Sequence, residues 1–489
     1  MIPPPTNAAS YLSTGRTIGS AAVDATERRA QLARSRLYLV LEARPNGRDP
    51  SELLAAALSG GVDVVQLRDK DAPDEELVAA AEPFRRLCAE HGSLFVLNDR
   101  PDLVERCGAD GVHVGQEDAA VADARQVVGA DRLVGLSVST PDELAAAHGD
   151  ADYLGVGAVY GTPTKSESRP AGLELVRLAR DTVRAPWFAI GGVDLETVAE
   201  VVTAGAPGVA VVRAIRDADD PAEAARRLRA ELPSARAVVT GRGESVRAVL
   251  PQIDVFEGTL AAGAPGARPH THRMHADVFY VLEGELELRV GDETVRVPAG
   301  SCVGAPQGLV HGFRNPGDIE ARYLNLHAPG VFERGSSAGL PPEHFDTFFG
   351  TDGGSPDVRA VGNGPGDGDR LAKEHRLALV KAVLPELDVI DYFVSPGYDG
   401  ADRHMHLRHA DCFYVLEGEL ELRADDDVVR AGPGTCVVVP PGVPHEFTSV
   451  GRARFLNVHA PESGFVEYLR KVDAGEKVDK AQYDQYELG

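Results

Sequence analysis

The sequence has few cysteines, no long apolar run and no recognisable export signal. Its five cysteines are scattered, odd in number and never in a CxxC pair, which favours reduced thiols. No stretch approaches the roughly 20 apolar residues of a membrane span. The start, MIPPPTNAASYLSTGRTIGS, has neither a basic segment nor an apolar segment of the signal-peptide kind. We therefore expect a cytoplasmic protein.

Basic residues are also scarce relative to acidic ones. Lys and Arg total 50 against 75 Asp and Glu, so the formal charge is −25. A chain of this charge repels phosphate backbones and anionic lipid, which argues against nucleic acid and membranes as partners. Cations that gather in one place would then have a local role.

The length of 489 residues suits about three domains. Residues 1–31 are expected to form a loose tail that leads into a short charged helix. From 32 to 232, apolar runs of strand length alternate with Ala-, Leu- and Glu-rich segments of helical period. The runs cover 37–42, 62–68, 93–98, 110–115, 132–137, 152–160, 186–192 and 208–215. Eight such units predict a closed (β/α)8 barrel, with a doubly wound open sheet as the alternative from the pattern alone.

After Leu232 the helical period ends and short alternating strands with Gly/Pro turns predict antiparallel β domains. This region repeats itself, since DVFYVLEGELELR at 277–289 returns as DCFYVLEGELELR at 411–423. We expect one β domain at 233–345 and a second at 372–489. The Gly-, Asp- and Pro-rich segment 346–371 between them is expected to be a flexible linker.

Polar residues collect where the strands of the predicted barrel end, which is where such barrels place their active sites. They are Gln66, Arg68, Lys70, Asn98, Asp99, Asp118, Ser137, Thr162, Thr164, Lys165, Gly191 and Gly192. Two carboxylates on adjacent strands can hold Mg²⁺ with diphosphate oxygens as further ligands, and the cations can neutralise a leaving diphosphate. Bare glycine backbone near strands 7 and 8 suits a second phosphate. The set predicts an anionic, metal-chelated substrate.

The motifs QLRDK, VLNDR, GVHVGQED, GLSVST, TPTK and WFAIGGV resemble, in order and spacing, those of thiamine phosphate synthases. The resemblance covers about residues 36–230 and implies the joining of a pyrimidine diphosphate to a thiazole phosphate. It implies that Asp99 and Asp118 bind Mg²⁺. The implied pyrimidine-diphosphate contacts are Gln66, Arg68, Lys70, Asn98 and Lys165. The implied thiazole-phosphate contacts are Thr162, Thr164, Gly192, Val212 and Arg213.

The family's reaction is dissociative, so diphosphate leaves first and the thiazole nitrogen captures the pyrimidine-methyl cation. Lys70, Ser137 and Lys165 are the residues we expect nearest the reacting groups. Arg213 departs from the family, where serine is common, and so does the strand-1 sequence LVLEAR. The related thiazole tautomerases carry a histidine after strand 5, but GLSVST has none. A degenerate barrel that binds without catalysis stays open as an alternative.

Each β domain resembles a cupin. The pairs HTH and HMH are each followed by a carboxylate five residues later and then by a GxxxxxPxGxxH motif. In a strand, residues i and i+2 face the same side, so HxH aims two imidazoles into one barrel. The expected ligands are His270, His272, Asp277 and His311 in the first copy and His404, His406, Asp411 and His445 in the second. Such a set suits Fe, Mn, Ni, Co or Zn.

The carboxylate is the departure from the cupin pattern, because the family usually has Glu. Aspartate is one methylene shorter, so His275 and His409 could substitute as ligands. His327 and His459, in the LNxHAP strands, are expected to be inward-facing core or supporting residues. A cupin that serves only as a scaffold is the alternative.

Three functions therefore remain in view from the sequence. The favoured one is thiamine phosphate synthesis by the barrel, with an appended metal-binding bicupin of unknown role. The second is a bicupin dioxygenase with a vestigial barrel, and the third is a ligand-sensing regulatory protein. The intact diphosphate set favours the first. Phosphorylated small molecules are the expected substrates, and a homodimer is a default expectation for both folds.

Overall fold

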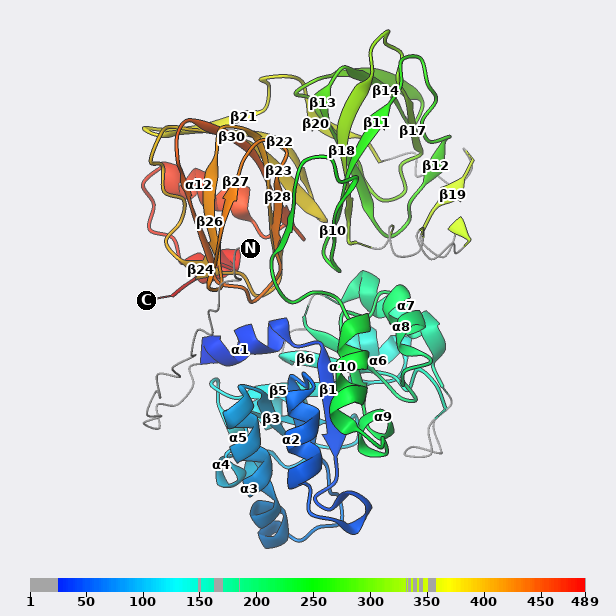
Figure 1. Ribbon diagram of the computed structural model, residues 1–489, viewed down its shortest axis with the longest axis vertical. Helices are drawn as coiled ribbons and strands as arrows, with labels where there is room; N and C mark the ends of the chain where they lie inside the picture. The colour runs from blue at the N-terminus through cyan, green and yellow to red at the C-terminus, as the bar shows by residue number, and fades with distance from the viewer. Residues whose placement is uncertain are drawn as a thin grey trace, which may run out of the picture.

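The computed structural model describes residues 25–147, 151–161, 170–183, 185–330, 332, 336, 341–342, 346–350 and 358–488. It consists of an α/β barrel and two β domains, which lie side by side above the barrel in Figure 1. No helix among the described residues is long and apolar enough to cross a membrane. The sequence therefore predicted the fold class of the barrel and of both β domains.

Eight parallel strands close the barrel in sequence order, which confirms the barrel and excludes the open sheet. The strands are β1 (Leu37–Leu41), β2 (Val64–Leu67), β3 (Leu94–Asn98), β4 (Gly111–Val114), β5 (Leu133–Val138), β6 (Tyr153–Val156), β7 (Trp187–Ile190) and β8 (Val209–Val211). The helices are α1 (Ala25–Arg34), α2 (Ser51–Ser59), α3 (Asp74–His91), α4 (Val104–Cys107), α5 (Val121–Val128), α6 (Pro141–Ala146), α7 (Gly172–Thr182), α8 (Val198–Thr203), α9 (Arg213–Arg216) and α10 (Pro221–Glu231).

Helix α1 packs against the amino-terminal end of the barrel. Leu32 belongs to the same buried cluster as the inward-facing Tyr38, Tyr153 and Phe188. Arg28 Nε donates to Asp110 Oδ1 at 2.9 Å, at the start of a barrel strand. The helix therefore covers this end of the barrel, and only the end formed by the carboxyl ends of the strands is left open for an active site.

The first β domain is a sandwich of two sheets. One has the order β10-β11-β18-β13-β16-β20 and the other β15-β14-β17-β12-β19. The bounds are β10 (Val246–Val249), β11 (Asp254–Leu260), β12 (His270–Thr271), β13 (Ala276–Glu283), β14 (Glu285–Val290), β15 (Glu293–Pro298), β16 (Cys302–Ala305), β17 (His311–Arg314), β18 (Ala321–Ala328), β19 (Phe348–Phe349) and β20 (Val361–Asn363).

The second β domain repeats this arrangement with sheets ordered β21-β22-β23-β30-β25-β28-β9 and β27-β26-β29-β24-β31. The bounds are β9 (Val238–Thr240), β21 (Asp369–Lys373), β22 (Arg376–Leu384), β23 (Leu387–Val394), β24 (His404–Met405), β25 (Ala410–Glu417), β26 (Leu420–Ala424), β27 (Asp427–Ala431), β28 (Cys436–Val439), β29 (His445–Ser449), β30 (Ala453–Ala460) and β31 (Tyr486–Glu487). Helix α12 (Phe465–Asp473) follows β30.

The two β domains exchange edge strands. Strand β9 precedes the first domain in sequence but pairs with β28 of the second. Strand β20 precedes the second domain and pairs with β16 of the first. The described parts of 346–371 thus include β19, β20 and the start of β21, so this segment is built into the sheets where we expected a flexible linker.

In each β domain, a tyrosine hydroxyl donates a hydrogen bond to a carboxylate of the other β domain. Tyr414 of the second domain donates its hydroxyl proton to Glu257 of the first at 2.6 Å. Tyr280 of the first donates to Asp391 of the second at 3.1 Å, where Arg454 also contacts Asp391. Around these contacts one apolar cluster contains residues of both domains. The pair therefore forms one packed unit.

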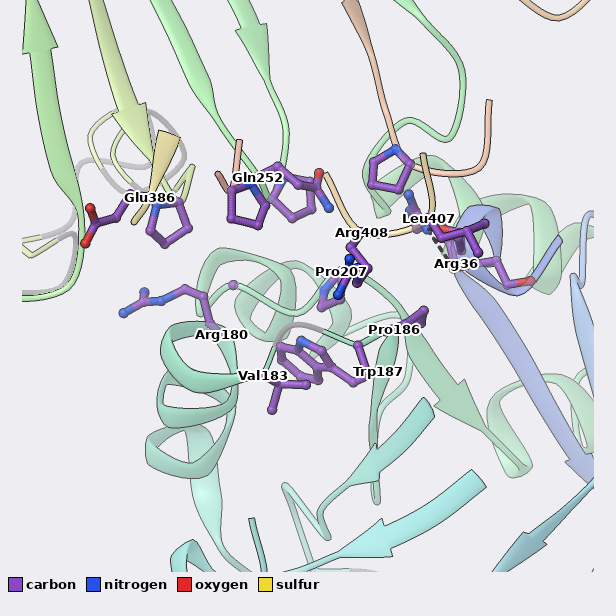
Figure 2. Close-up of a pocket in the computed structure, with 18 residues that line it drawn as sticks. Arg36, Arg180, Val183, Pro186, Trp187, Pro207, Gln252, Glu386, Leu407 and Arg408 are labelled. Atoms are coloured by element: carbon purple, nitrogen blue, oxygen red, sulfur yellow. Dashed lines mark hydrogen bonds between the residues drawn. The ribbon is translucent and has the colours of Figure 1, made fainter. Parts of the chain in front are cut away.

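The β domains meet the barrel at its amino-terminal end. Figure 2 shows the junction, a cavity of about 90 Å³ with Pro186, Trp187 and Pro207 below and Gln252 and Arg408 above. Strand β1 points away from this junction in Figure 1, so the mouth of the barrel faces away from both β domains.

Candidate active site and metal centres

A cavity of about 480 Å³ opens at the carboxyl ends of the barrel strands. All the expected barrel residues that the structure describes line it. They are Gln66, Arg68, Lys70, Asn98, Asp99, Asp118, Ser137, Gly191, Gly192, Val212 and Arg213. Thr162, Thr164 and Lys165 lie outside the described residues.

The two carboxylates expected to bind Mg²⁺ face one cation, Lys70. Its Nζ lies 2.8 Å from Asp99 Oδ2 and 3.9 Å from Asp118 Oδ1. Asn98 Nδ2 donates to Asp99 Oδ2 at 2.6 Å, and the Gly115 backbone N–H donates to Asp118 Oδ2 at 3.1 Å. Neutral donors thus orient the two carboxylates, and the half-exposed Lys70 ammonium lies between them. This donor set fits a hard divalent cation.

The glycine turn after β7 forms another part of the wall. Gly192 has a φ of +69°, and a Cβ there would lie 2.7 Å from the Cβ of Tyr160. Only glycine fits this position without displacing a neighbour. Val212 and Arg213 line the cavity together with this turn.

A chain of hydrogen bonds crosses the floor of the cavity. Gln66 Nε2 donates to the Tyr38 hydroxyl at 2.9 Å, and this hydroxyl lies 3.0 Å from that of Tyr153. His113 continues the chain with Nδ1 3.2 Å from the Tyr153 hydroxyl and Nε2 2.9 Å from Ser137 Oγ. Burial raises the pKa of both tyrosines, so their hydroxyls stay protonated.

Sequence reasoning missed Tyr38, His113 and Tyr153. For His113 the signal was the alternation in GVHVG. Val112 and Val114 belong to the core outside the strands, so His113 between them must face into the barrel. A polar residue between two buried valines of a barrel strand is therefore an inward-facing candidate.

Each β domain brings its four expected metal ligands together. In the first, the ligand atoms of His270, His272, Asp277 and His311 all lie within 4.8 Å of one another. His270 and His311 are direct partners across β12 and β17. Asp277 Oδ2 lies 3.1 Å from His311 Nε2, so the aspartate reaches the histidines despite its shorter side chain.

The second domain repeats this cluster. The ligand atoms of His404, His406, Asp411 and His445 also lie within 4.8 Å of one another. Asp411 Oδ2 lies 3.3 Å from His445 Nε2.

Backbone carbonyls orient every histidine of these clusters. In the first domain, the Nδ1 atoms of His270, His272 and His311 lie 2.7, 2.7 and 2.9 Å from the carbonyl oxygens of Arg268, Asp346 and Leu309. The second domain repeats the contacts at 2.8, 2.8 and 3.0 Å for His404, His406 and His445. A proton on Nδ1 leaves the lone pair on Nε2, which is how metal-binding histidines are prepared.

Burial and, to a lesser extent, neighbouring histidines lower the pKa of four of these imidazoles. The pKa of His270 falls to about 4 and that of His404 to about 2, and the pKa values of His272 and His406 fall as well. These four rings are therefore neutral at pH 7, the form that binds metal.

Two aspartates that sequence reasoning missed hold the histidine loops. Asp346 accepts hydrogen bonds from the backbone of Arg273 and Met274, and Asp484 accepts the matching bonds from Leu407 and Arg408. Their sequences, FDTF at 345–348 and YDQY at 483–486, are a further trace of the internal repeat. Comparing the ends of the two copies would have found them.

The fold and these sites define a (β/α)8 barrel with a polar cavity at the carboxyl ends of its strands, joined to a double cupin with two histidine and aspartate clusters. Residues 37–215 match the family model described as thiamine monophosphate synthase. Residues 256–327 and 392–459 match the cupin domain. The chain belongs to the thiamine phosphate synthase family and carries two cupin domains after the barrel.

Relatives support this assignment. The thiamine-phosphate synthase of Mycobacterium bovis is 44% identical over 218 residues, which are 42% of this chain and 98% of that protein. The thiamine-phosphate synthase of a Synechocystis species is 47% identical over 206 residues, which are 41% of this chain. The chain spans 58% of the Synechocystis protein.

A solved structure matches the same region. It is a thiamine phosphate pyrophosphorylase from Pyrococcus furiosus, which is 33% identical and has a TM-score of 0.38. The match covers 41% of this chain and 96% of that one.

Proposed function

We propose that the barrel condenses hydroxymethylpyrimidine diphosphate with hydroxyethylthiazole phosphate to give thiamine phosphate and diphosphate. The observation that carries this proposal is the cavity at the carboxyl ends of the strands. It gathers a carboxylate pair, three cations, two amides and a glycine turn, which are the groups that two phosphorylated substrates need. A barrel that had lost catalysis would have no reason to keep this set intact.

The diphosphate end of the cavity is formed by Arg68, Lys70, Asp99 and Asp118. Asp99 and Asp118 would hold Mg²⁺, which supplies positive charge to the leaving diphosphate. Lys70 contacts both carboxylates and can turn from them to the diphosphate oxygens. Arg68 adds a further cation on the same wall.

The pyrimidine is expected to lie over the polar chain on the floor of the cavity. Gln66, Asn98, His113 and Ser137 present amide, imidazole and hydroxyl groups to a heterocycle with ring nitrogens and an amino group. The thiazole phosphate is expected at Gly192, Val212 and Arg213.

The test is formation of thiamine phosphate by the purified chain with both substrates and Mg²⁺, beside the variant Asp99→Ala. We expect magnesium-dependent product from the wild type and a loss of at least about 100-fold in the variant, because a charged group that acts on the leaving group is removed. Asp102→Ala is the matched control, since Asp102 is a nearby carboxylate outside the cavity. No product from the folded wild type would refute the proposal.

We further propose that each cupin binds a divalent transition metal through its three histidines and its aspartate. The supporting observation is that all six histidines contact a backbone carbonyl through Nδ1, so their Nε2 lone pairs face one point in each domain. Nitrogen ligands of this kind favour Fe, Mn, Ni, Co or Zn over Mg.

A further inference from the structure

The inner walls of the two cupins differ in how far they are buried. In the first cupin, one face of the strands lies towards the metal cluster, as the contact of Asn325 with Asp277 shows, and the other face packs on the second cupin. Matching positions of this inner face are half-buried in the first cupin and buried in the second. The half-buried residues are Phe256, Gly258, Leu260, Val303, Tyr323 and Asn325, and their buried counterparts are Ile390, Tyr392, Val394, Val437, Phe455 and Asn457.

These half-buried side chains belong to the interior of the domain. Leu260, Val303 and Tyr323 pack against the inner apolar cluster of the first cupin, and the Phe256 ring lies 5.4 Å from that of His327. Because the side chains point into the sandwich, their exposed surface faces a space inside the first cupin that solvent can enter.

The strand pairing shows where the first cupin is open. Strand β10 pairs with β11 at Asp254, Val255 and Phe256, so within the described ranges the outer edge of residues 258–260 pairs with no strand. In the second cupin, β22 pairs with β23 over the whole length of β23, and β21 adds a further strand. The first cupin therefore lacks the cover that the second cupin has along this edge.

One difference between the copies lies at this open edge. Tyr392 of the second cupin takes the position of Gly258, and its ring stacks on Phe455 with centroids 5.1 Å apart and planes at 6°. In the first cupin the paired residues are Gly258 and Tyr323. A Cβ on Gly258 would lie 2.6 Å from the Tyr323 hydroxyl oxygen, so this hydroxyl reaches over the glycine.

The Tyr323 hydroxyl is available to a ligand. It has no hydrogen bond to any of the described residues, and its side chain is half-buried. Burial and the charge of Asp277 raise the pKa of Tyr323 to about 12, so the hydroxyl keeps its proton at pH 7. An inward-facing donor without a partner suits an acceptor group of a bound molecule.

Aromatic rings connect the open edge to the metal cluster. The centroid of the Phe279 ring lies 6.1 Å from that of Tyr323 and 6.5 Å from that of the ligand His311. Phe313 lies beside Tyr323, with ring centroids 5.4 Å apart. A wall of this kind suits a planar aromatic ring, since aromatic pairs add to the free energy gained by burying apolar surface.

The metal cluster favours a negatively charged group on such a ring. Histidines bind metal as neutral imidazoles, so with Asp277 as the one carboxylate a divalent ion keeps a net positive charge. Four ligands also leave open positions on the metals that accept larger coordination numbers. An anionic oxygen can occupy such a position.

We propose that the first cupin, and not the second, binds a small aromatic compound through an anionic oxygen on the cupin metal. The ring of this compound lies against Phe279 and Phe313, and the Tyr323 hydroxyl donates a hydrogen bond to a polar group on it. The second cupin holds its metal in a closed interior. This inference rests on the proposed binding of metal by the cupins.

The test counts the aromatic molecules bound per chain. The metal-stripped full-length protein is loaded with Co²⁺, with Mg²⁺ in excess to occupy the barrel carboxylates. It is then titrated with 4-nitrocatechol, a planar probe with two neighbouring oxygens whose visible absorption changes on binding a metal. We expect about two cobalt ions but about one probe molecule per chain, since one cupin of the two is open. Protein with Mg²⁺ alone gives the baseline.

Two variants locate the probe. Gly258→Tyr with Tyr323→Phe gives the first cupin the residue pair of the second, and should keep both cobalt ions while weakening probe binding at least about ten-fold. Tyr323→Phe alone should weaken it about two- to ten-fold, because one hydrogen bond is lost. Tyr486→Phe, at a half-buried tyrosine of the second cupin, is the control and should change nothing.

The outcomes separate the two proposals. Two probe molecules per chain, or none, on protein that holds both cobalt ions would refute this inference and leave metal binding by the cupins standing. Unchanged probe binding in the double variant, with both ions retained, would also refute it. A wild type that binds no cobalt would refute both proposals. The wild-type count does not depend on any variant folding.

Discussion

Tyr153 links the two halves of the polar chain under the barrel cavity. Its hydroxyl lies 3.0 Å from that of Tyr38 and 3.2 Å from His113 Nδ1. We expect Tyr153→Phe to lower kcat/KM for thiamine phosphate formation by about two- to ten-fold, because a net hydrogen bond contributes about 0.5–1.5 kcal/mol. Steady-state kinetics would show this, with Tyr392→Phe, at a buried tyrosine of the second cupin, as the control. An unchanged kcat/KM would mean that the chain does not position His113.

The buried histidines make the stability of the metal-free cupins depend on pH. His270 has a pKa of about 4 in the folded chain against about 6.5 when unfolded. Between these values only the unfolded chain takes up the proton, so stability falls as the pH falls from 6.5 towards 4. His270 alone should cost about 2 kcal/mol at pH 5 relative to pH 7.5.

Urea unfolding of the chelator-treated protein at pH 7.5, 6.5 and 5 would measure this loss. His270→Gln should reduce the dependence by the share of this one group, since glutamine does not titrate while the other buried histidines still do. A stability that stays level down to pH 5 in the wild type would contradict the neutral, buried state of these rings.

Sequence reasoning found the residues whose side-chain type indicates their chemical role. Asp99, Asp118 and the HxH pairs combine charge or imidazole with a recognisable spacing, and the structure gathers all of them. It missed Asp346 and Asp484 because each acts through its backbone oxygen and a local loop, about 70 residues from the histidines that it orients. Such partners depend on tertiary folding, which spacing alone does not encode.

At the scale of elements, the exchanged strand β20 tests how closely the two cupins depend on each other. A Cβ on Gly362 would lie 2.1 Å from the carbonyl oxygen of Cys302 on the neighbouring strand β16. We expect Gly362→Ala to push β20 from the sheet and to cost about 1–3 kcal/mol of unfolding free energy.

Urea unfolding compares this variant with Gly432→Ala, where a Cβ would meet nothing within 4 Å. The control should stay within about 0.5 kcal/mol of the wild type. Equal stability of the two variants would show that the edge pairing of β20 contributes little.

Every expected barrel strand was confirmed, with its start within two residues and its end within four residues of the prediction, whereas the strand exchange was not predicted. Each barrel strand pairs with its neighbours in sequence order, so a periodic pattern suffices to place it. Strands β9 and β20 are three residues long; β20 lies in the expected linker, and β9 lies at the start of the segment expected to form the first β domain. Which edge such a short strand joins is decided by the packing of the two domains, and a pattern within the strand carries no information about it.

At the scale of the whole molecule, the barrel cavity and the cupin clusters are kept apart. The cavity opens at the carboxyl ends of the strands, and the cupins pack against the amino ends (Figure 1). A product leaving the barrel would therefore have to pass through solvent to reach a cupin. The halves meet at the junction that contains Arg180 (Figure 2). Arg180 Nη2 lies 3.4 Å from Sδ of Met274, which directly precedes His275 of the first cupin.

This separation predicts independent activities. His272→Ala with His406→Ala should remove the cupin metals, because each change deletes a central ligand, and should leave thiamine phosphate formation within about two-fold of the wild type. Metal content and synthesis are measured on the same preparation. A folded variant that binds no metal and no longer synthesises would show that the junction couples the two halves.

The strand exchange also has an evolutionary consequence. Two copies that arose by duplication normally remain free to be lost one at a time. Here deleting either copy would take an edge strand from the other and uncover the apolar face that the two share. Since an open edge and a bare apolar face both promote aggregation, a return to a single cupin is disfavoured. The duplication is therefore hard to reverse, and we expect the two cupins to be inherited together.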